Sequence, residues 1–433
     1  MEGNNTRRPA GPIKVTLAPA ERRRQSAIRW LVLVLTAVLT AAAVILGARL
    51  LGNSGVATAA QTPREVLDAR DAKPAAAAES VAGTTRFVPI GPDLVLDTRG
   101  RGPVAPGADT EIELSDLPAD TSAVLAEVSV LESTGEGDLT IDGGAGPVTV
   151  LRVPKAGVQT TANAIVQVGP DRTLVVKAAG GGDVLVNLVG AFQPAQTSAE
   201  GRIVPMPPAE VVHLVPKKDG KEATIKLSDV DALRNADPSA ILLQVAGDVG
   251  PNGGRISAGA DKGTMLQTLF WGPTKGADRT RVGFLAVPVT GDVVRLRYVA
   301  GTEMRADLVG YVTGKGAEVT DTGLIVPVTP ANPDPVRVDA GLKEKVAVVP
   351  SGIPAPRVAA ALLSVTATGD AVGKVNAYQP GTKATGNPTV VAPRDTARAA
   401  FALVGTADGA VQVSSEAGAA VSLTARALIL GAP

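Results

Sequence analysis

The stretch Gly291–Gly301, "GDVVRLRYVAG", decides the fold class of this chain. Its apolar residues Val294, Leu296 and Tyr298 alternate with two arginines. Alternation with a period of two puts the apolar side chains on one face of a β-strand and the charged side chains on the other. The stretch therefore predicts a strand in a sheet that buries one face.

The same period recurs along the chain. In "AVLAEVSV", which starts at Ala123, the apolar side chains share a face opposite Glu127 and Ser129. The 48 glycines and 33 prolines predict frequent turns between short strands, and no long amphipathic helical pattern appears after the first 60 residues. These features predict an all-β fold built of sandwiches.

Three copies of one pattern fill most of the chain. The opening strand reads "RFVPIGP" from Arg86, "RIVPMPP" from Arg202 and "LIVPVTP" from Leu324. Each copy is as long as a small domain and so is not a solenoid unit. We expect three tandem β-sandwich domains joined by short linkers, with the boundaries 85–194, 201–314 and 322–433.

An N-terminal membrane segment is predicted before the repeats. The uncharged apolar run Trp30–Leu46 resumes at Leu50, and at about 1.5 Å per residue a helix over 30–52 would span a bilayer core. Basic residues are concentrated in 1–29, which predicts a cytoplasmic N-terminus and an extracytoplasmic bulk in a single-pass cell-membrane protein. Residues 53–84, poor in bulky apolar side chains, are predicted to be a stalk. The alternative is a secretion signal cleaved after about Ala59.

The amino-acid composition excludes several classes of functional site. Lys+Arg and Asp+Glu both number 42, so net charge gives no case for nucleic-acid binding. Cysteine is absent and His213 is the single histidine, which excludes thiolate metal sites and paired histidine ligands. We expect no catalytic residues, no cofactor and no metal.

The triplet Asp97-Thr98-Arg99 ends the first long strand and is the most motif-like feature of the sequence. An acid, a hydroxyl and a guanidinium together allow catalysis, but no histidine or cysteine lies in this repeat to activate Thr98. The preferred interpretation is structural: Asp97 accepts hydrogen bonds from the backbone or from Arg99 and holds the strand end.

Three further candidates have weaker patterns. Asp138 and Asp142 lie on one strand face and offer two carboxylates, whereas a calcium site needs about six oxygens. His213 alone is interpreted as a surface or strand-end histidine rather than as a base. Phe270 and Trp271 form a possible ligand platform, with core packing as the alternative.

The repeats resemble the extracellular β-sandwich modules of actinobacterial surface and secreted proteins. The resemblance rests on "LVLDTR" from Leu94, "LPADTSAVLAEVSV" from Leu117 and "NLVGAF" from Asn187, with "DLVGYV" from Asp307 and "LLSVTATG" from Leu362 in the later copies. It implies an envelope role without an attached reaction. The second and third copies lack the Asp-Thr-Arg triplet.

The expected function is that of a non-enzymatic, membrane-anchored cell-envelope protein that displays three modules for structural or protein-interaction roles. Membrane lipid, envelope proteins and cell-wall glycan are the expected partners. The alternatives are a glycan- or peptidoglycan-binding module set and an accessory subunit of a membrane complex.

Overall fold

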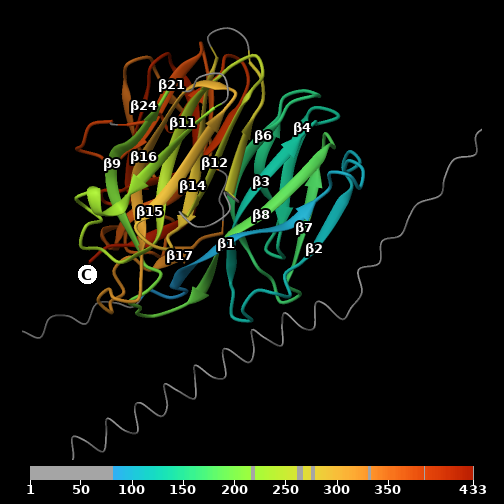
Figure 1. The fold of residues 1–433 in the computed structure, drawn as a ribbon. Helices are drawn as coiled ribbons and strands as arrows, with labels where there is room; N and C mark the ends of the chain where they lie inside the picture. The colour runs from blue at the N-terminus through green and yellow to red at the C-terminus, as the bar shows by residue number, and fades with distance from the viewer. Residues whose placement is uncertain are drawn as a thin grey trace, which may run out of the picture. The chain divides into compact units, whose positions relative to one another are not determined.

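The computed structural model describes residues 81–215, 220–260, 267–274, 278–329, 333–384 and 386–432. In this part of the chain, strands β1 to β25 are joined by turns and by two single-turn 3-10 helices, η1 (Leu227–Asp229) and η2 (Ala355–Arg357) (Figure 1). The predicted all-β fold class is therefore confirmed.

The strands fall into three successive groups, which we call the first, second and third repeats. The first repeat holds β1 (Thr85–Asp97), β2 (Asp109–Glu113), β3 (Ala123–Leu131), β4 (Gly137–Asp142), β5 (Val148–Val153), β6 (Thr160–Gln167), β7 (Thr173–Ala178) and β8 (Asp183–Pro194). The second holds β9 (Ile203–Leu214), β10 (Lys221–Lys226), β11 (Pro238–Val249), β12 (Gly254–Ala260), β13 (Gln267–Trp271), β14 (Thr280–Pro288), β15 (Val293–Val299) and β16 (Gly301–Thr313). The third holds β17 (Ile325–Pro327), β18 (Val336–Val338), β19 (Lys343–Ala347), β20 (Val358–Gly369), β21 (Gly373–Tyr378), β22 (Val390–Ala392), β23 (Arg398–Gly405), β24 (Ala410–Ser415) and β25 (Ala419–Leu430).

One strand order occurs in all three repeats. In the first repeat an inner sheet, β6-β3-β8-β1, faces an outer sheet, β2-β7-β4-β5. The second repeat has β14-β11-β16-β9 and β10-β15-β12-β13, and the third has β23-β20-β25-β17 and β19-β24-β21-β22. Numbered within each repeat, the order is 6-3-8-1 facing 2-7-4-5, which is that of an eight-stranded jelly roll. The short β18 is an addition to the third repeat that also pairs with β25.

Each repeat has its own apolar core between its two sheets. The three clusters consist largely of Val, Leu, Ile and Ala, with Trp271 and Tyr298 as the aromatic members in the second repeat. The alternation in Gly291–Gly301 is borne out, because Val294, Leu296 and Tyr298 are fully buried while Arg297 is exposed.

A fourth apolar cluster joins the repeats. It contains Phe87 and Phe192 from the first repeat, Phe284 from the second and Phe401 from the third, with Ile, Leu, Val and Ala side chains of the inner strands. The rings of Phe284 and Phe401 meet edge to face across two repeats at a centroid distance of 5.3 Å. The described residues, which begin at 81, accordingly belong to one compact unit.

The inner sheets are therefore covered on both faces, which corrects the expectation of one buried face. Glu127 and Ser129 were placed on the polar face of their strand, yet both are buried. The physical reason is that the side of β3 facing away from its own core packs against the second repeat. Ser129 lies on this side next to Thr161 of the same repeat, with 2.7 Å between their hydroxyl oxygens, and the Thr161 hydroxyl in turn accepts the Phe270 N–H of the second repeat at 2.8 Å.

Backbone contacts between the opening strands close the arrangement into a ring. The Phe87 N–H donates to the Gly201 carbonyl at 2.7 Å, and the Ile203 N–H donates to the Gly323 carbonyl at the same distance. Thr85 pairs with Ile325, which brings the third repeat back to the first. These positions correspond to one another in the three copies of the opening strand.

Glycine is required at the linker positions of this ring. Gly201 has φ +84°, and a Cβ there would lie 2.6 Å from the Phe87 carbonyl oxygen. Gly323 has φ +88° and would meet the Ile203 carbonyl oxygen at 2.8 Å. Any other residue would combine left-handed backbone strain with a clash.

The predicted location in the membrane is corrected. In the part of the chain that the structure describes, no helix has the length and apolar character needed to cross a bilayer. This finding contradicts the expected single-pass membrane protein. The segments on which the expectation rested, 1–29, 30–52 and most of the predicted stalk 53–84, lie outside the described residues, as does Ala59.

Candidate functional site

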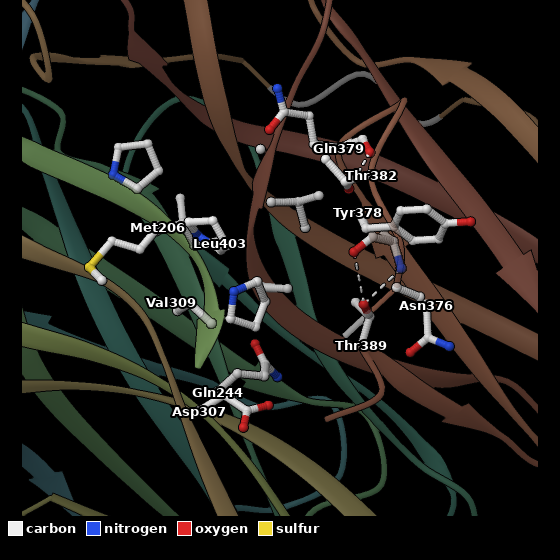
Figure 2. Close-up of a pocket in the computed structure, with 18 of the residues that line it drawn as sticks. Met206, Gln244, Asp307, Val309, Asn376, Tyr378, Gln379, Thr382, Thr389 and Leu403 are labelled. Carbon is white, nitrogen blue, oxygen red and sulfur yellow. Dashed lines mark hydrogen bonds between the residues drawn. The ribbon is translucent and has the colours of Figure 1, made fainter. Parts of the chain in front are cut away.

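A cleft between the second and third repeats is the main candidate binding site. Its volume is about 300 Å³, and it lies among the prolines of β9, the inner strands β11 and β16, strand β23 and the loop after β21. Figure 2 shows the side chains that line it. Such clefts at the junctions of structural units are common places for ligands.

Gln244 and Asp307 form the polar end of the cleft, where they lie close together in Figure 2. They are direct partners in the register of β11 and β16. Asn387 of the third repeat closes this end, since its side-chain amide donates to the Gln244 carbonyl at 3.1 Å and to the Arg305 carbonyl at 3.2 Å. The Asn387 backbone N–H donates to the Asp307 carboxylate.

The carboxyl of Asp307 is unusual because it is 1% exposed. Burial raises its pKa, and the hydrogen bond from the Asn387 backbone N–H opposes this shift in part. Nearby Glu210 raises the pKa further, while Arg305 lowers it. The group joins the two repeats and also reaches the cleft.

The third repeat supplies a wall of amide and hydroxyl side chains together with the ring of Tyr378. Asn376 and Tyr378 come from β21, and Thr389 stands beside them in Figure 2. The Thr389 hydroxyl accepts a 2.8 Å hydrogen bond from the Ala377 N–H, which fixes its position. The Tyr378 hydroxyl is buried and has no hydrogen-bond partner in the described chain.

An apolar wall faces these groups. Met206, Val309 and Leu403 line it, together with prolines of the opening strand of the second repeat (Figure 2). The cleft thus offers one apolar surface and one polar surface of mostly neutral donors and acceptors, with Lys383 and Asp307 as its charged members. A ligand with an apolar face and several hydroxyl or amide groups matches this division.

A second, more polar cavity of about 480 Å³ shares Pro208 and Asn387 with the cleft. Glu303 and Arg305 line it, and the Arg305 side chain donates to Glu303 at 2.9 Å. His213 Nε2 lies 2.9 Å from the same carboxylate. Both contacts lower the pKa of Glu303, and the hydrogen bond from Arg305 has the larger effect.

The predicted triplet lies away from both cavities and ties two strand ends together. Arg99 binds Asp97 through Nε at 3.0 Å and Nη2 at 2.7 Å, and its backbone N–H also donates to Asp97 at 3.0 Å. The hydrogen bond from Arg99 is the main reason why the pKa of Asp97 is lowered. The Thr98 hydroxyl accepts a 2.8 Å hydrogen bond from the Val184 N–H.

The aromatic pair considered as a ligand platform lies at the junction of the first and second repeats. Trp271 is 2% exposed and meets Tyr298 edge to face at 6.3 Å between centroids. The Phe270 backbone N–H donates to the Thr161 hydroxyl at 2.8 Å. Phe270 is half-buried.

The two aspartates considered for calcium have separate partners. Asp142 accepts hydrogen bonds from the backbone N–H groups of Gly144 and Gly146, and Asp138 lies 3.5 Å from Arg152. Among the described residues, no group of three or more His, Asp or Glu side chains is placed to hold a metal ion.

Sequence reasoning did not identify the cleft. A usable signal was the connection Gln379–Thr389 of the third repeat, which contains one Gln, three Thr and one Asn and is longer than its counterpart Gly143–Pro147 in the first. The sequence gives no comparable signal for the opposite wall. Gln244 and Asp307 lie in strands whose mostly apolar sequence predicts burial in the core.

Comparisons with known proteins do not assign a family. No family model matches the chain, and no curated protein matches it. Two solved structures that resemble it were described as "The Triple Jelly Roll Fold and Turret Assembly in an Archaeal Virus" and "Life in the extremes: atomic structure of Sulfolobus Turreted Icosahedral Virus". Each is 10% identical, with a TM-score of 0.16, and the match covers 80% of this chain and 91% of the other. At this score the likeness carries no argument about the present chain.

Proposed function

We propose that this chain is a non-enzymatic binding protein whose cleft between the second and third repeats takes a short neutral glycan. The observation that carries the proposal is the pairing of an apolar wall with a wall in which amide and hydroxyl groups outnumber the charged side chains. Sugars present both kinds of surface, with C–H groups on one face and hydroxyls at the edges, so each wall has a counterpart on such a ligand.

Binding without turnover is favoured by the side chains of the cleft. Those in the described chain include neither histidine nor serine. Both threonine hydroxyls are engaged: Thr382 donates to the Gln379 carbonyl at 2.7 Å, and Thr389 accepts from Ala377. Hydrolysis of a glycan commonly uses a pair of carboxyl groups that flank the scissile bond, whereas Asp307 is the single carboxyl residue among the described residues of the cleft.

We also propose that residues 85–194, 201–314 and 322–433 are three β-sandwich domains of a protein that interacts with envelope components. The resemblance to actinobacterial surface modules supports this reading. The shared apolar cluster implies that the three act as one scaffold, so a partner would meet a cleft of fixed shape.

The test is binding of the full chain to isolated cell wall and to soluble chitotriose and muropeptide fragments, measured by pull-down and calorimetry. Asn376→Ala and Gln379→Ala are expected to weaken binding about fivefold or more, because each removes a hydrogen bond to the ligand. Asn235→Ala, at an exposed turn, is the matched control. Binding that is absent for every glycan, or equal in all variants, contradicts the proposal.

A further inference from the structure

A third cavity lies where all three repeats meet. Its volume is about 650 Å³, and its walls come from the β5–β6 connection of the first repeat, the region around β13 and β14 of the second, and the start of β23 in the third. It is separate from the cleft proposed above, since the two share no lining residue.

The charged side chains of this cavity are mostly cationic. Among the described lining residues they are Arg152, Lys155, Arg281 and Arg398, with Asp278 as the single carboxylate. Arg152 is paired outside the cavity, at 3.1 Å from Glu136 and 3.5 Å from Asp138. Lys155 is exposed and forms no ion pair within the described chain.

Asp278 is shared by two guanidinium groups. Arg398 binds it through both terminal nitrogens, at 2.8 and 2.6 Å, and Arg281 Nη1 lies 3.2 Å from its Oδ1. The side chains of Asp278, Arg281 and Arg398 are only 23%, 18% and 20% exposed. One carboxylate therefore faces two partly buried positive charges.

One edge of the Arg281 guanidinium makes no hydrogen bond within the described chain. All its protein contacts are made by Nη1, to the Asp278 carboxylate and to the carbonyls of Asp278 and Thr280. Its Nε and Nη2 atoms donate to no acceptor in the described chain, and these two atoms form the edge that grips a carboxylate or phosphate with two parallel hydrogen bonds. Burial and the repulsion from Arg398 lower the pKa of Arg281 to about 10, so a further anion would relieve an existing imbalance.

We propose that this three-repeat cavity binds a small oxyanion ligand, a phosphate- or carboxylate-bearing molecule of about sugar size. The Nε–Nη2 edge of Arg281 would hold the anionic group, with Lys155 as the second cation. The volume exceeds that of a bare phosphate, which leaves room for a body attached to the anion. The proposal is independent of glycan binding in the other cleft.

The test is calorimetry on the full chain with inorganic pyrophosphate, citrate and glucose. Saturable binding of pyrophosphate or citrate, weakened by added salt, is expected, and glucose should not displace the bound anion. Which of the two anions binds distinguishes a phosphate ligand from a carboxylate ligand. Arg281→Gln should weaken the binding about tenfold or more, and Lys155→Gln about threefold.

Lys345→Gln, on the exposed outer strand β19, is the control and should leave the affinity unchanged. Lys155→Gln keeps the test decisive if Arg281→Gln fails to fold, because the Lys155 side chain is exposed and lies outside the Asp278 cluster. No saturable binding of either anion to the unaltered chain, or binding insensitive to Lys155→Gln, would overturn the proposal.

Discussion

Glu127 of β3 and Thr268 of β13 are joined across the first two repeats, because the Glu127 carboxyl oxygen Oε1 accepts the Thr268 backbone N–H at 3.2 Å. Asn187 donates to the same oxygen at 3.2 Å, while Oε2 is buried with no partner in the described chain. A similar contact joins the second and third repeats, where the buried carboxylate of Asp307 accepts the backbone N–H of Asn387.

The first prediction concerns the pH dependence of stability. Burial raises the pKa of Glu127 from 4.5 to about 7, against the opposing hydrogen bonds. The folded chain therefore binds this proton more tightly than the unfolded chain, and stability is lost as the pH rises from about 4.5 through 7. The loss is on the order of 3 kcal/mol for a shift of this size.

Thermal unfolding of Glu127→Gln and of the unaltered chain between pH 4 and pH 8 measures this effect. The variant should gain stability relative to the unaltered chain as the pH rises, because its amide stays neutral. Glu111→Gln on the outer strand β2 serves as the control. Parallel stability profiles for Glu127→Gln and the unaltered chain would show that Glu127 is not the responsible group.

The second prediction concerns the shared apolar cluster. Phe284→Ala and Phe401→Ala should each lower the free energy of unfolding by about 3–5 kcal/mol, since each opens a cavity in a closed core. The double variant should reveal a coupling of about 0.5–1.5 kcal/mol, typical of edge-to-face pairs. Chemical denaturation gives both quantities.

Phe87 and Phe192 are the matched pair within one repeat, with the same 5.3 Å separation. If the repeats pack as described, the coupling between Phe284 and Phe401 equals that of this internal pair within error. A coupling near zero for Phe284 and Phe401 alone would mean that the second and third repeats do not touch there.

The third prediction concerns a linker glycine. Gly201→Ala should destabilise the chain by about 2 kcal/mol or more, because left-handed strain adds to contact with the Phe87 carbonyl. Gly107→Ala isolates the strain, since Gly107 has φ +73° and open space around it. Equal losses in the two variants would show that the linker contact is unimportant.

The fourth prediction separates structure from chemistry at the triplet. Thr98→Val leaves the Val184 N–H without its acceptor and should cost about 1–3 kcal/mol of folding free energy. Thr110→Val in β2 controls for the change of side chain. Denaturation curves that overlap for Thr98→Val and the unaltered chain would remove the structural role assigned to the hydroxyl.

The fold class was readable from the sequence because alternation in strands such as Val293–Val299 reports burial on one face directly. The packing of the repeats was not readable, because it places Glu127 and Ser129 in the interior, where a pattern of alternating polarity implies solvent. The cleft and the three-repeat cavity arise from the same packing. Residues such as Gln244 and Arg281 become neighbours of the third repeat only when the three repeats pack into the ring. The local sequence around them therefore does not predict either site.

The central claim is that the three repeats form one closed unit, and a cross-link tests it most directly. The chain has no cysteine. Thr85→Cys and Ile325→Cys introduce a pair at directly opposed antiparallel positions of the first and third repeats. Such partners lie about 4.5–5.5 Å apart at Cα, which a disulfide can span.

Mild oxidation should convert this pair to an intramolecular disulfide almost completely, as measured by thiol titration and peptide mapping. The control pair Thr110→Cys and Ile325→Cys should stay reduced, because β2 belongs to the outer sheet of the first repeat. Free thiols at 85 and 325 in the folded monomer, or disulfides only between molecules, would contradict the closed ring.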